Sequence, residues 1–400
     1  MEGWTQKRIG DLFDVKAGGD LQEANYSPCP TAEAQWPIYA NSLENEGLYG
    51  YTSKPRFSGN AVTITGRGDI GHAEFRPIDF DAIVRLLVLL PKAEVDCRYI
   101  TYYINSHVHF PKESTGVPQL TAPKVKRIKI DLPQSKEEQT AIANILSKVD
   151  EAIAYVQNSI AAAERLKKSL MQNLLTGKMK PDGTFRTPEE FYIEEKFGKV
   201  PVGWEVKRID DVSDDVQYGL NLASSETGNI PMLRMNNIVN GEMTDTPLVY
   251  VSLDSQLLQQ YELGQGDILF NRTNSMDLVG KVGIFKLAGK YVFASYLIRI
   301  KVSKENNPYY VNMALNSHPI QCSLRSKATP AVSQANINSK SLRHTNILVP
   351  KDKQEQDSIV AKIDSIDQIL LKEQDKTKKL ERLKKSLMQN LLTGKVKLLY

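Results

Sequence analysis

The spacing of apolar residues in two segments of the chain predicts two long helices. In each segment these residues follow one another at alternating steps of four and three, which are the a and d positions of a coiled-coil heptad. They are Ile142, Leu146, Val149 and Ile153 in the first segment and Ile359, Ile363, Ile366 and Leu370 in the second. We expect these eight residues to form the interface where the two helices pair.

The two helical segments are copies of one another. The sequence ERLKKSLMQNLLTGK occurs at 164–178 and again, unchanged, at 381–395. The same offset aligns Pro133 with Pro350, and Trp4 has a weaker counterpart in Trp204. An internal repeat of this kind indicates a tandem duplication, in which a globular part and a helix are followed by a second globular part and helix.

Runs rich in β-branched residues and bounded by glycine or proline predict strands in both globular parts. In the first half the runs are 61–65, 82–90 and 125–132, and in the second half 267–270, 282–285, 291–302 and 346–349. The predicted fold class is therefore α+β. It has two tandem domains of mixed α/β structure, each followed by a long α-helix, and the two helices pair as an antiparallel coiled coil with pseudo-two-fold symmetry. We expect the domain boundaries 1–133, 134–179 (helix), 180–199 (linker), 200–350 and 351–400 (helix).

Composition narrows the class of protein but does not identify its partner. The chain has 400 residues, 41% of them hydrophobic and 24% charged, as in an ordinary globular protein. It has no apolar run of membrane-spanning length and no apolar leader at its start. Three cysteines without a CxxC pattern indicate reduced thiols, so we expect a cytoplasmic protein. With 51 basic and 47 acidic residues, neither domain has the strong positive charge that points to nucleic acid.

Two motifs suggest enzymes, and neither fits its context. GRGDIG at 66–71 matches a dinucleotide loop, but Pro77 follows too soon for the helix that such a site needs. NPYY at 307–310 resembles the active-site tetrapeptide of amino-methyltransferases without its second proline. The repeat aligns Asn307 with Asp96, and both residue types favour a helix N-cap. Metal-ligand clusters and nucleophile motifs are also absent from the sequence, so we expect neither a catalytic centre nor a metal site.

Polar residues gather in two segments of the second half, 233–243 and 266–285. Their Arg, Asn, Thr and Ser side chains are of the types that bind bases and phosphates, although the same residues also form turns. Together with the repeated helix, several segments resemble specificity subunits of type I restriction-modification enzymes. They are GDILFNRTNS (266–275), LVGKVGIF (278–285), PMLRMNNIVNG (231–241) after Tyr218, and STGVPQL (114–120). The first half departs from this pattern, with GNAVTITGRGDIG (59–71) in place of GDILFNRTNS.

The resemblance implies a non-catalytic DNA-binding subunit. Each of its two target-recognition domains would read one half of a bipartite site in double-stranded DNA. The helices would dock methyltransferase subunits, two in number, and through them the restriction subunits. The resemblance also implies that this chain binds no cofactor, because S-adenosylmethionine and ATP belong to the partner subunits. The alternative is a protein-interaction scaffold that dimerises through its coiled coil, and salt-dependent DNA affinity would separate the two.

The resemblance and the residue chemistry together give candidate DNA contacts. In the second domain they are Tyr218, Arg234, Asn236, Asn237, Asn271, Arg272, Thr273, Asn274, Ser275 and Gln334. In the first domain they are Lys54, Arg56, Arg67, Asp69, Ser114, Thr115 and Gln119.

Overall fold

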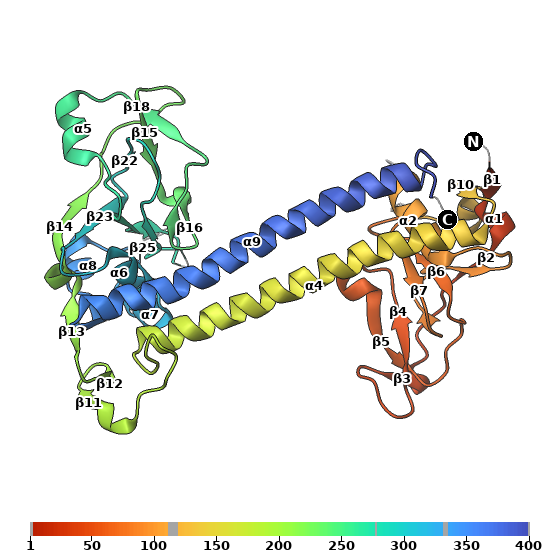
Figure 1. The fold of residues 1–400 in the computed structure, drawn as a ribbon, viewed down its shortest axis with the longest axis horizontal. Helices are drawn as coiled ribbons and strands as arrows, with labels where there is room; N and C mark the ends of the chain where they lie inside the picture. The colour runs from red at the N-terminus through yellow and green to blue at the C-terminus, as the bar shows by residue number, and fades with distance from the viewer. Residues whose placement is uncertain (1–2, 111–118, 277, 331–334, 399–400) are drawn as a thin grey trace. The chain divides into compact units, whose positions relative to one another are not determined.

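The structure is a computed structural model, and it describes residues 3–110, 119–276, 278–330 and 335–398 (Figure 1). The chain forms two compact units. Unit 1 consists of Met1–Ser159 with Glu373–Tyr400, and unit 2 consists of Ile160–Lys372. Both long helices, α4 (Lys136–Leu175) and α9 (Lys353–Leu391), contribute one part to each unit.

Unit 1 contains two four-stranded sheets. The strands of the first lie in the order β2 (Phe13–Ala17), β9 (Leu87–Pro91), β6 (Ala61–Ile64) and β7 (Ala73–Arg76). Those of the second lie in the order β3 (Tyr26–Ser27), β5 (Leu48–Thr52), β4 (Trp36–Tyr39) and β8 (Asp81–Ala82). The remaining elements are β1 (Trp4–Arg8), α1 (Ile9–Leu12), α2 (Cys97–His107), α3 (Ala122–Lys126) and β10 (Lys129–Pro133).

Unit 2 is built on a six-stranded sheet. Its order is β14 (Ser213–Tyr218), β23 (Leu297–Val302), β19 (Ile268–Asn271), β21 (Val282–Ile284), β17 (Glu242–Met243) and β16 (Ile238–Val239). Unit 2 also contains two three-stranded sheets. The strands of one lie in the order β18 (Val249–Val251), β15 (Ile230–Leu233) and β22 (Val292–Phe293). Those of the other lie in the order β20 (Thr273–Asn274), β25 (Ala335–Asn336) and β24 (Thr329–Pro330). The other elements are β13 (Trp204–Arg208), α5 (Ser255–Tyr261), α6 (Pro308–Leu315), α7 (His318–Ser326), α8 (Ser339–Arg343) and β26 (Asn346–Pro350).

The duplication extends from the helices into the sheets. The antiparallel order β2–β9–β6–β7 in unit 1 recurs as β14–β23–β19–β21 in unit 2. In each unit a strand near the start of the globular part, β1 or β13, pairs with the strand that precedes the long helix, β10 or β26. This pairing places Trp4 opposite Pro133 in unit 1 and Trp204 opposite Pro350 in unit 2. The same frame is therefore built twice.

In each unit a part of α4 lies against a part of α9, and the two run in opposite directions (Figure 1). Asp150 of α4 forms an ion pair with Lys384 of α9 in unit 1. The corresponding pair in unit 2 joins Lys167 to Asp367, with the roles of the two helices exchanged. These ion pairs obey the repeat, because Lys384 is the copy of Lys167 and Asp367 is the copy of Asp150. The predicted fold class, with its antiparallel helix pair, is confirmed.

The residues predicted to form the helix interface serve two surfaces. Ile142 and Leu146 are fully buried in the core of unit 1, which also contains Leu391, the last residue of α9, and Leu392, which follows it. The first three predicted interface residues of α9 are buried in the core of unit 2; they are Ile359, Ile363 and Ile366. The other three positions are half-buried, and they are Val149, Ile153 and Leu370. The first interface residues of each helix therefore also pack into the core of the domain that precedes the helix.

Three of the predicted strands need correction, and the predicted linker contains a hairpin. The first part of 125–132 is helix α3, because Pro123 favours a helix start and Val125 is fully buried there. The runs 82–90 and 291–302 are each divided by a turn into two strands. The predicted linker also contains structure, since β11 (Phe191–Glu194) pairs there with β12 (Gly198–Pro201).

A buried glutamine joins each long helix to its domain. Gln139 Oε1 accepts a hydrogen bond from Asp96 N–H at 3.0 Å, and its Nε2 donates to the carbonyl of Pro133 at 2.9 Å. Its copy, Gln356, accepts from Asn307 N–H at 2.8 Å and donates to Pro350 at 3.0 Å. Both side chains are 1% exposed. Each glutamine thus ties together the helix start, the last strand and the beginning of α2 or α6.

Replacing Gln139 with leucine should destabilise the protein by about 2–4 kcal/mol, because a buried N–H and a buried carbonyl lose their partners. The measurement is the free energy of unfolding from urea denaturation. Lys148→Ala is the matched control, since Lys148 is an exposed residue of the same helix, and it should cost less than about 0.5 kcal/mol. Equal losses in the two variants would show that the glutamine does not join the helix to the domain.

Candidate nucleic-acid interface

Arg272 is held at one end of the main sheet of unit 2. It directly follows β19 and precedes β20, whose Thr273 pairs with Asn336 of β25. The backbone N–H of Arg272 donates to the carbonyl of Tyr296 at 3.1 Å, and its own carbonyl accepts from Ile337 N–H at 2.9 Å. These bonds fix the backbone of Arg272, so its side chain leaves the sheet in a defined direction.

Three neighbours position the guanidinium of Arg272. Its Cζ lies 4.8 Å from the centre of the Tyr218 ring, within the range of a cation–π contact. Its Nη2 lies 3.4 Å from Asn336 Oδ1, and Asn336 Nδ2 donates to Thr273 Oγ1 at 3.0 Å. We call Tyr218, Arg272, Thr273 and Asn336 the Arg272 cluster. A planar cation held in this way can donate two parallel hydrogen bonds to guanine or to a phosphate.

Tyr218 is itself fixed by the start of helix α8. Its hydroxyl oxygen accepts a hydrogen bond from Ser339 N–H at 2.9 Å. Partial burial would raise the pKa of Tyr218, but the bond from Ser339 and the positive charge of Arg272 outweigh it. The pKa of Tyr218 therefore lies below the usual value for tyrosine. The ring is 39% exposed, so one part of it remains free for a ligand.

Exposed apolar side chains lie on the loops beside the cluster. Asn274 Nδ2 is 3.4 Å from the Sδ atom of Met235, which brings the loop after β15 next to the loop after β19. Met235, Met276 and Leu278 are all more than a third exposed. Apolar groups of this kind contact the methyl group of thymine, so the surface combines donors for polar base edges with apolar contacts.

Two of the predicted contacts in unit 2 are wrong because their side chains are buried. Asn237 is 0% exposed, and it accepts from Arg234 N–H at 2.9 Å and donates to the carbonyl of Pro247 at 3.0 Å. Asn271 is also 0% exposed, and its Nδ2 donates to the carbonyl of Leu278 at 3.3 Å. Both asparagines hold the loops in shape and cannot reach a ligand directly.

The other candidates of unit 2 remain accessible. Asn236 and Ser275 are exposed, whereas Arg234, Arg272, Thr273 and Asn274 are half-buried. Gln334 lies outside the described residues. Sequence reasoning missed Asn336, although the repeat contained a signal for it. The offset that relates the two helices also aligns Asn336 with Gln119, which was predicted as a contact in the first domain.

Among the described residues, the predicted contacts of unit 1 form no hydrogen bond or ion pair with one another. Arg56 is wrong as a free contact, because its Nε donates to Asp81 at 2.5 Å and its Nη2 to the carbonyls of Asp20 and Ala82. Lys54, Arg67 and Asp69 are exposed, and Gln119 is half-buried. Ser114 and Thr115 lie outside the described residues.

Unit 1 has no arginine at the position that corresponds to Arg272. The carbonyl of Gly66 accepts from Leu120 N–H at 2.9 Å, as the carbonyl of Arg272 accepts from Ile337 N–H. Gly66 therefore stands where unit 2 has Arg272. The two units share a frame but present different side chains at this place.

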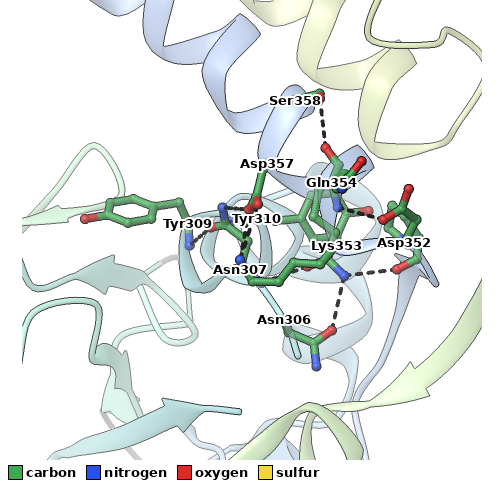
Figure 2. Close-up of polar contacts among 11 residues, drawn as sticks. Asn306, Asn307, Tyr309, Tyr310, Asp352, Lys353, Gln354, Asp357 and Ser358 are labelled. Carbon is green, nitrogen blue, oxygen red and sulfur yellow. Dashed lines mark hydrogen bonds and ion pairs between the residues drawn. The ribbon is translucent and has the colours of Figure 1, made fainter. Parts of the chain in front are cut away.

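The two motifs that suggested enzymes have structural roles. After 66–71 the chain enters strand β7 and not a helix, so the dinucleotide loop is excluded there. Asn307 is the N-cap of α6: its Oδ1 accepts from Tyr309 N–H at 2.8 Å and from Tyr310 N–H at 3.2 Å (Figure 2). Its Nδ2 donates to Asp357 of α9 at 2.7 Å (Figure 2). The prediction that NPYY begins a helix is confirmed.

Among the residues that the structure describes, no group of three or more His, Cys, Asp or Glu side chains is placed to hold a metal ion. Within the same residues, no helix has the length and apolar character needed to cross a membrane.

Comparison with known proteins identifies the class to which this duplicated frame belongs. Residues 1–165 and 201–382 match the family described as the type I restriction modification DNA specificity domain. The chain belongs to this family, and the two matched segments correspond to the two halves of the duplication.

Relatives and solved structures agree with this assignment. The type I restriction enzyme MjaVIII specificity subunit of Methanocaldococcus jannaschii is 26% identical over 322 residues, which cover 76% of this chain and 71% of that protein. The putative MjaX specificity subunit of the same organism is 28% identical over 215 residues, about half the length of each protein. The crystal structure of a type I restriction-modification S subunit from M. genitalium shares the fold. Its TM-score is 0.62 at 17% identity, with 97% of this chain and 96% of that chain covered.

The N-cap of α2 provides a pH test of the repeated frame. Asp96, the counterpart of Asn307, accepts from Arg98 N–H at 2.8 Å and from Tyr99 N–H at 3.2 Å, and it forms an ion pair with Arg98 at 2.9 Å. Burial raises the pKa of this carboxyl, but Arg98 and the Tyr99 N–H outweigh burial and hold the pKa below the usual value for aspartate. A depressed pKa in the folded state stabilises the protein above the unfolded pKa, and this stabilisation disappears as pH falls through the folded value.

Wild type should therefore lose more stability between pH 5 and pH 2 than Asp96→Asn, in which the cap resembles that of α6 and does not titrate. The measurement is the free energy of unfolding across this pH range, where all other carboxyl groups are common to both proteins. Parallel curves for the two proteins would contradict the assigned role of Asp96.

Proposed function

We propose that this chain is the DNA-recognition subunit of a type I restriction-modification complex and that each unit reads one half of a bipartite site in double-stranded DNA. The observation that carries the proposal is the Arg272 cluster, in which a sheet end, an aromatic ring and an asparagine hold a guanidinium beside exposed polar and apolar side chains. A guanidinium fixed in this way suits base recognition, whereas scaffolds that bind protein do not need one.

In this proposal the subunit is not catalytic and binds no cofactor. Methyltransferase subunits bring S-adenosylmethionine, and restriction subunits, attached through them, bring ATP. One solved relative, with a TM-score of 0.56 at 17% identity, comes from work on complex assembly of the type I system. That likeness supports the fold, and the family supports the partners.

The repeated helix surface supports two copies of the methyltransferase subunit. Six helical residues of the unchanged repeat are exposed in both copies. They are Glu164, Arg165, Leu166, Lys168, Ser169 and Gln172, with Glu381, Arg382, Leu383, Lys385, Ser386 and Gln389. Leu166 is 49% exposed and Leu383 is 47% exposed. Because the same side chains are presented twice, one kind of partner can bind at both places.

Arg272 provides the most direct test of base recognition. The chain is co-expressed with its methyltransferase subunit, the methylated sequence is mapped, and binding is measured on DNA with each base pair replaced in turn. Arg272→Ala should lose about 1–3 kcal/mol of discrimination at one base pair of one half-site and leave the other half-site unchanged. Lys199→Ala removes an exposed charge from the hairpin β11–β12 and should leave every base preference unchanged.

The same binding assay separates this proposal from the scaffold alternative. DNA contacts release counterions, so the affinity of the assembled complex should fall steeply as salt rises. Binding without sequence preference, together with an Arg272→Ala variant that matches wild type, would contradict the proposed function.

A further inference from the structure

The turn between β8 and β9 of unit 1 has an unusual backbone. Its two central residues, Val84 and Arg85, have φ values of +53° and +60°. This left-handed region disfavours side chains, and for a β-branched residue such as valine it is a rare exception. Such conformations persist only where the surrounding structure enforces them, and they concentrate at functional sites.

Three hydrogen bonds hold this turn, and a fourth holds Asn41, which donates one of them. Val84 N–H donates to the carbonyl of Gly19 at 3.0 Å, and Leu86 N–H donates to the carbonyl of Ile83 at 3.1 Å. Asn41 completes the set from a neighbouring loop. Its Nδ2 donates to the carbonyl of Val84, and its Oδ1 accepts from Gly66 N–H at 2.7 Å. Asn41 thus fixes the turn and the start of the loop 66–71 relative to each other.

The result of this strain is an exposed arginine with free donors. Val84 is 51% exposed and Arg85 is also exposed. Within the described part of the chain, the guanidinium of Arg85 forms no hydrogen bond, ion pair or ring contact. The arginines of β7 and α2 differ, because Arg76 donates to Thr63 and Arg98 pairs with Asp96.

The repeated frame places Arg85 at the same sheet end as Arg272. Gly18 N–H donates to Leu86 in unit 1, as Gly219 N–H donates to Leu297 in unit 2. Arg85 therefore corresponds to Tyr296, whose carbonyl accepts from Arg272 N–H. In unit 2 the arginine comes from the segment after β19 and the turn residue is a tyrosine. In unit 1 the segment after β6 has Gly66, and the turn supplies the arginine.

We propose that Arg85 is the base-contacting arginine of unit 1, that it reads a guanine of the first half-site, and that Asn41 is its positioning residue. This proposal rests on the proposed function, since it names the side chain by which unit 1 would recognise DNA. Arginine donates two hydrogen bonds to guanine O6 and N7 in a fixed fork, which lysine cannot reproduce.

The test uses the chain assembled with its methyltransferase subunit and the base-pair replacement assay. Arg85→Lys keeps the charge and should lose about ten- to hundredfold of the preference at one base pair of the first half-site. Its preference in the second half-site should stay unchanged. Arg127→Lys is the matched control, because Arg127 is an exposed arginine of the same unit just after helix α3 and is not among the candidate contacts, and it should keep the wild-type preference at that base pair.

Other outcomes would overturn the proposal. Arg85→Lys and Arg85→Ala variants that both keep every base preference would show that Arg85 does not contact a base. Uniform weakening in Arg85→Ala, restored in Arg85→Lys, would indicate a phosphate contact. Failure of the proposed function is distinct, because wild type itself would then show no sequence preference.

Asn41→Ala tests the positioning role. It should reduce the preference at the same base pair as Arg85→Lys, because the turn loses its link to Gly66. A change in thermal stability alone, with the base preference intact, would overturn this role. The double variant Asn41→Ala with Arg85→Lys should show no further loss at that base pair.

Discussion

The structure depends on the joint between each globular part and the long helix that follows it. The first strand of each part pairs with the last, so the chain enters and leaves the domain at the same place. Gln139 and Gln356 then fix the start of each helix to the last strand and to the N-cap of α2 or α6. The isoleucines that follow are buried in the domain cores. The start of each helix is therefore fixed to the domain that precedes it.

This joint allows the recognition loops to change without disturbing the frame. The order of four strands and the pairing that precedes each helix are the same in both units, while the side chains at the common sheet end differ. Unit 2 has Arg272 and Tyr296 where unit 1 has Gly66 and Arg85. The proposed recognition of two different half-sites requires this separation, because specificity would reside in a few side chains while stability resides in the buried frame.

The sequence predicted the parts of the structure that repeat. The seam from Ile142 to Ile153, the duplication and the cap at Asn307 all follow from periodicity and residue type, which act locally. Burial at Asn237 and Asn271 could not be predicted, because polar residues in turns look the same whether they bind a ligand or the backbone. The turn at Val84 and Arg85 could not be predicted either, since valine favours strands and the left-handed backbone depends on Asn41, which is distant in the sequence. Asn336 could have been found by extending the repeat.

The central claim is that the two units share one repeated frame and that each recognises its own half-site in whichever of the two positions it occupies. It is tested most directly by replacing residues 4–133 with a second copy of 204–350, which joins Pro350 to the first helix where Pro133 now stands. The chimera, assembled with the methyltransferase subunit, is then mapped for methylated sites. The account predicts a palindromic site made of two copies of the second half-site. A folded, assembled chimera that still methylates the wild-type site, or that methylates without sequence preference, would contradict it.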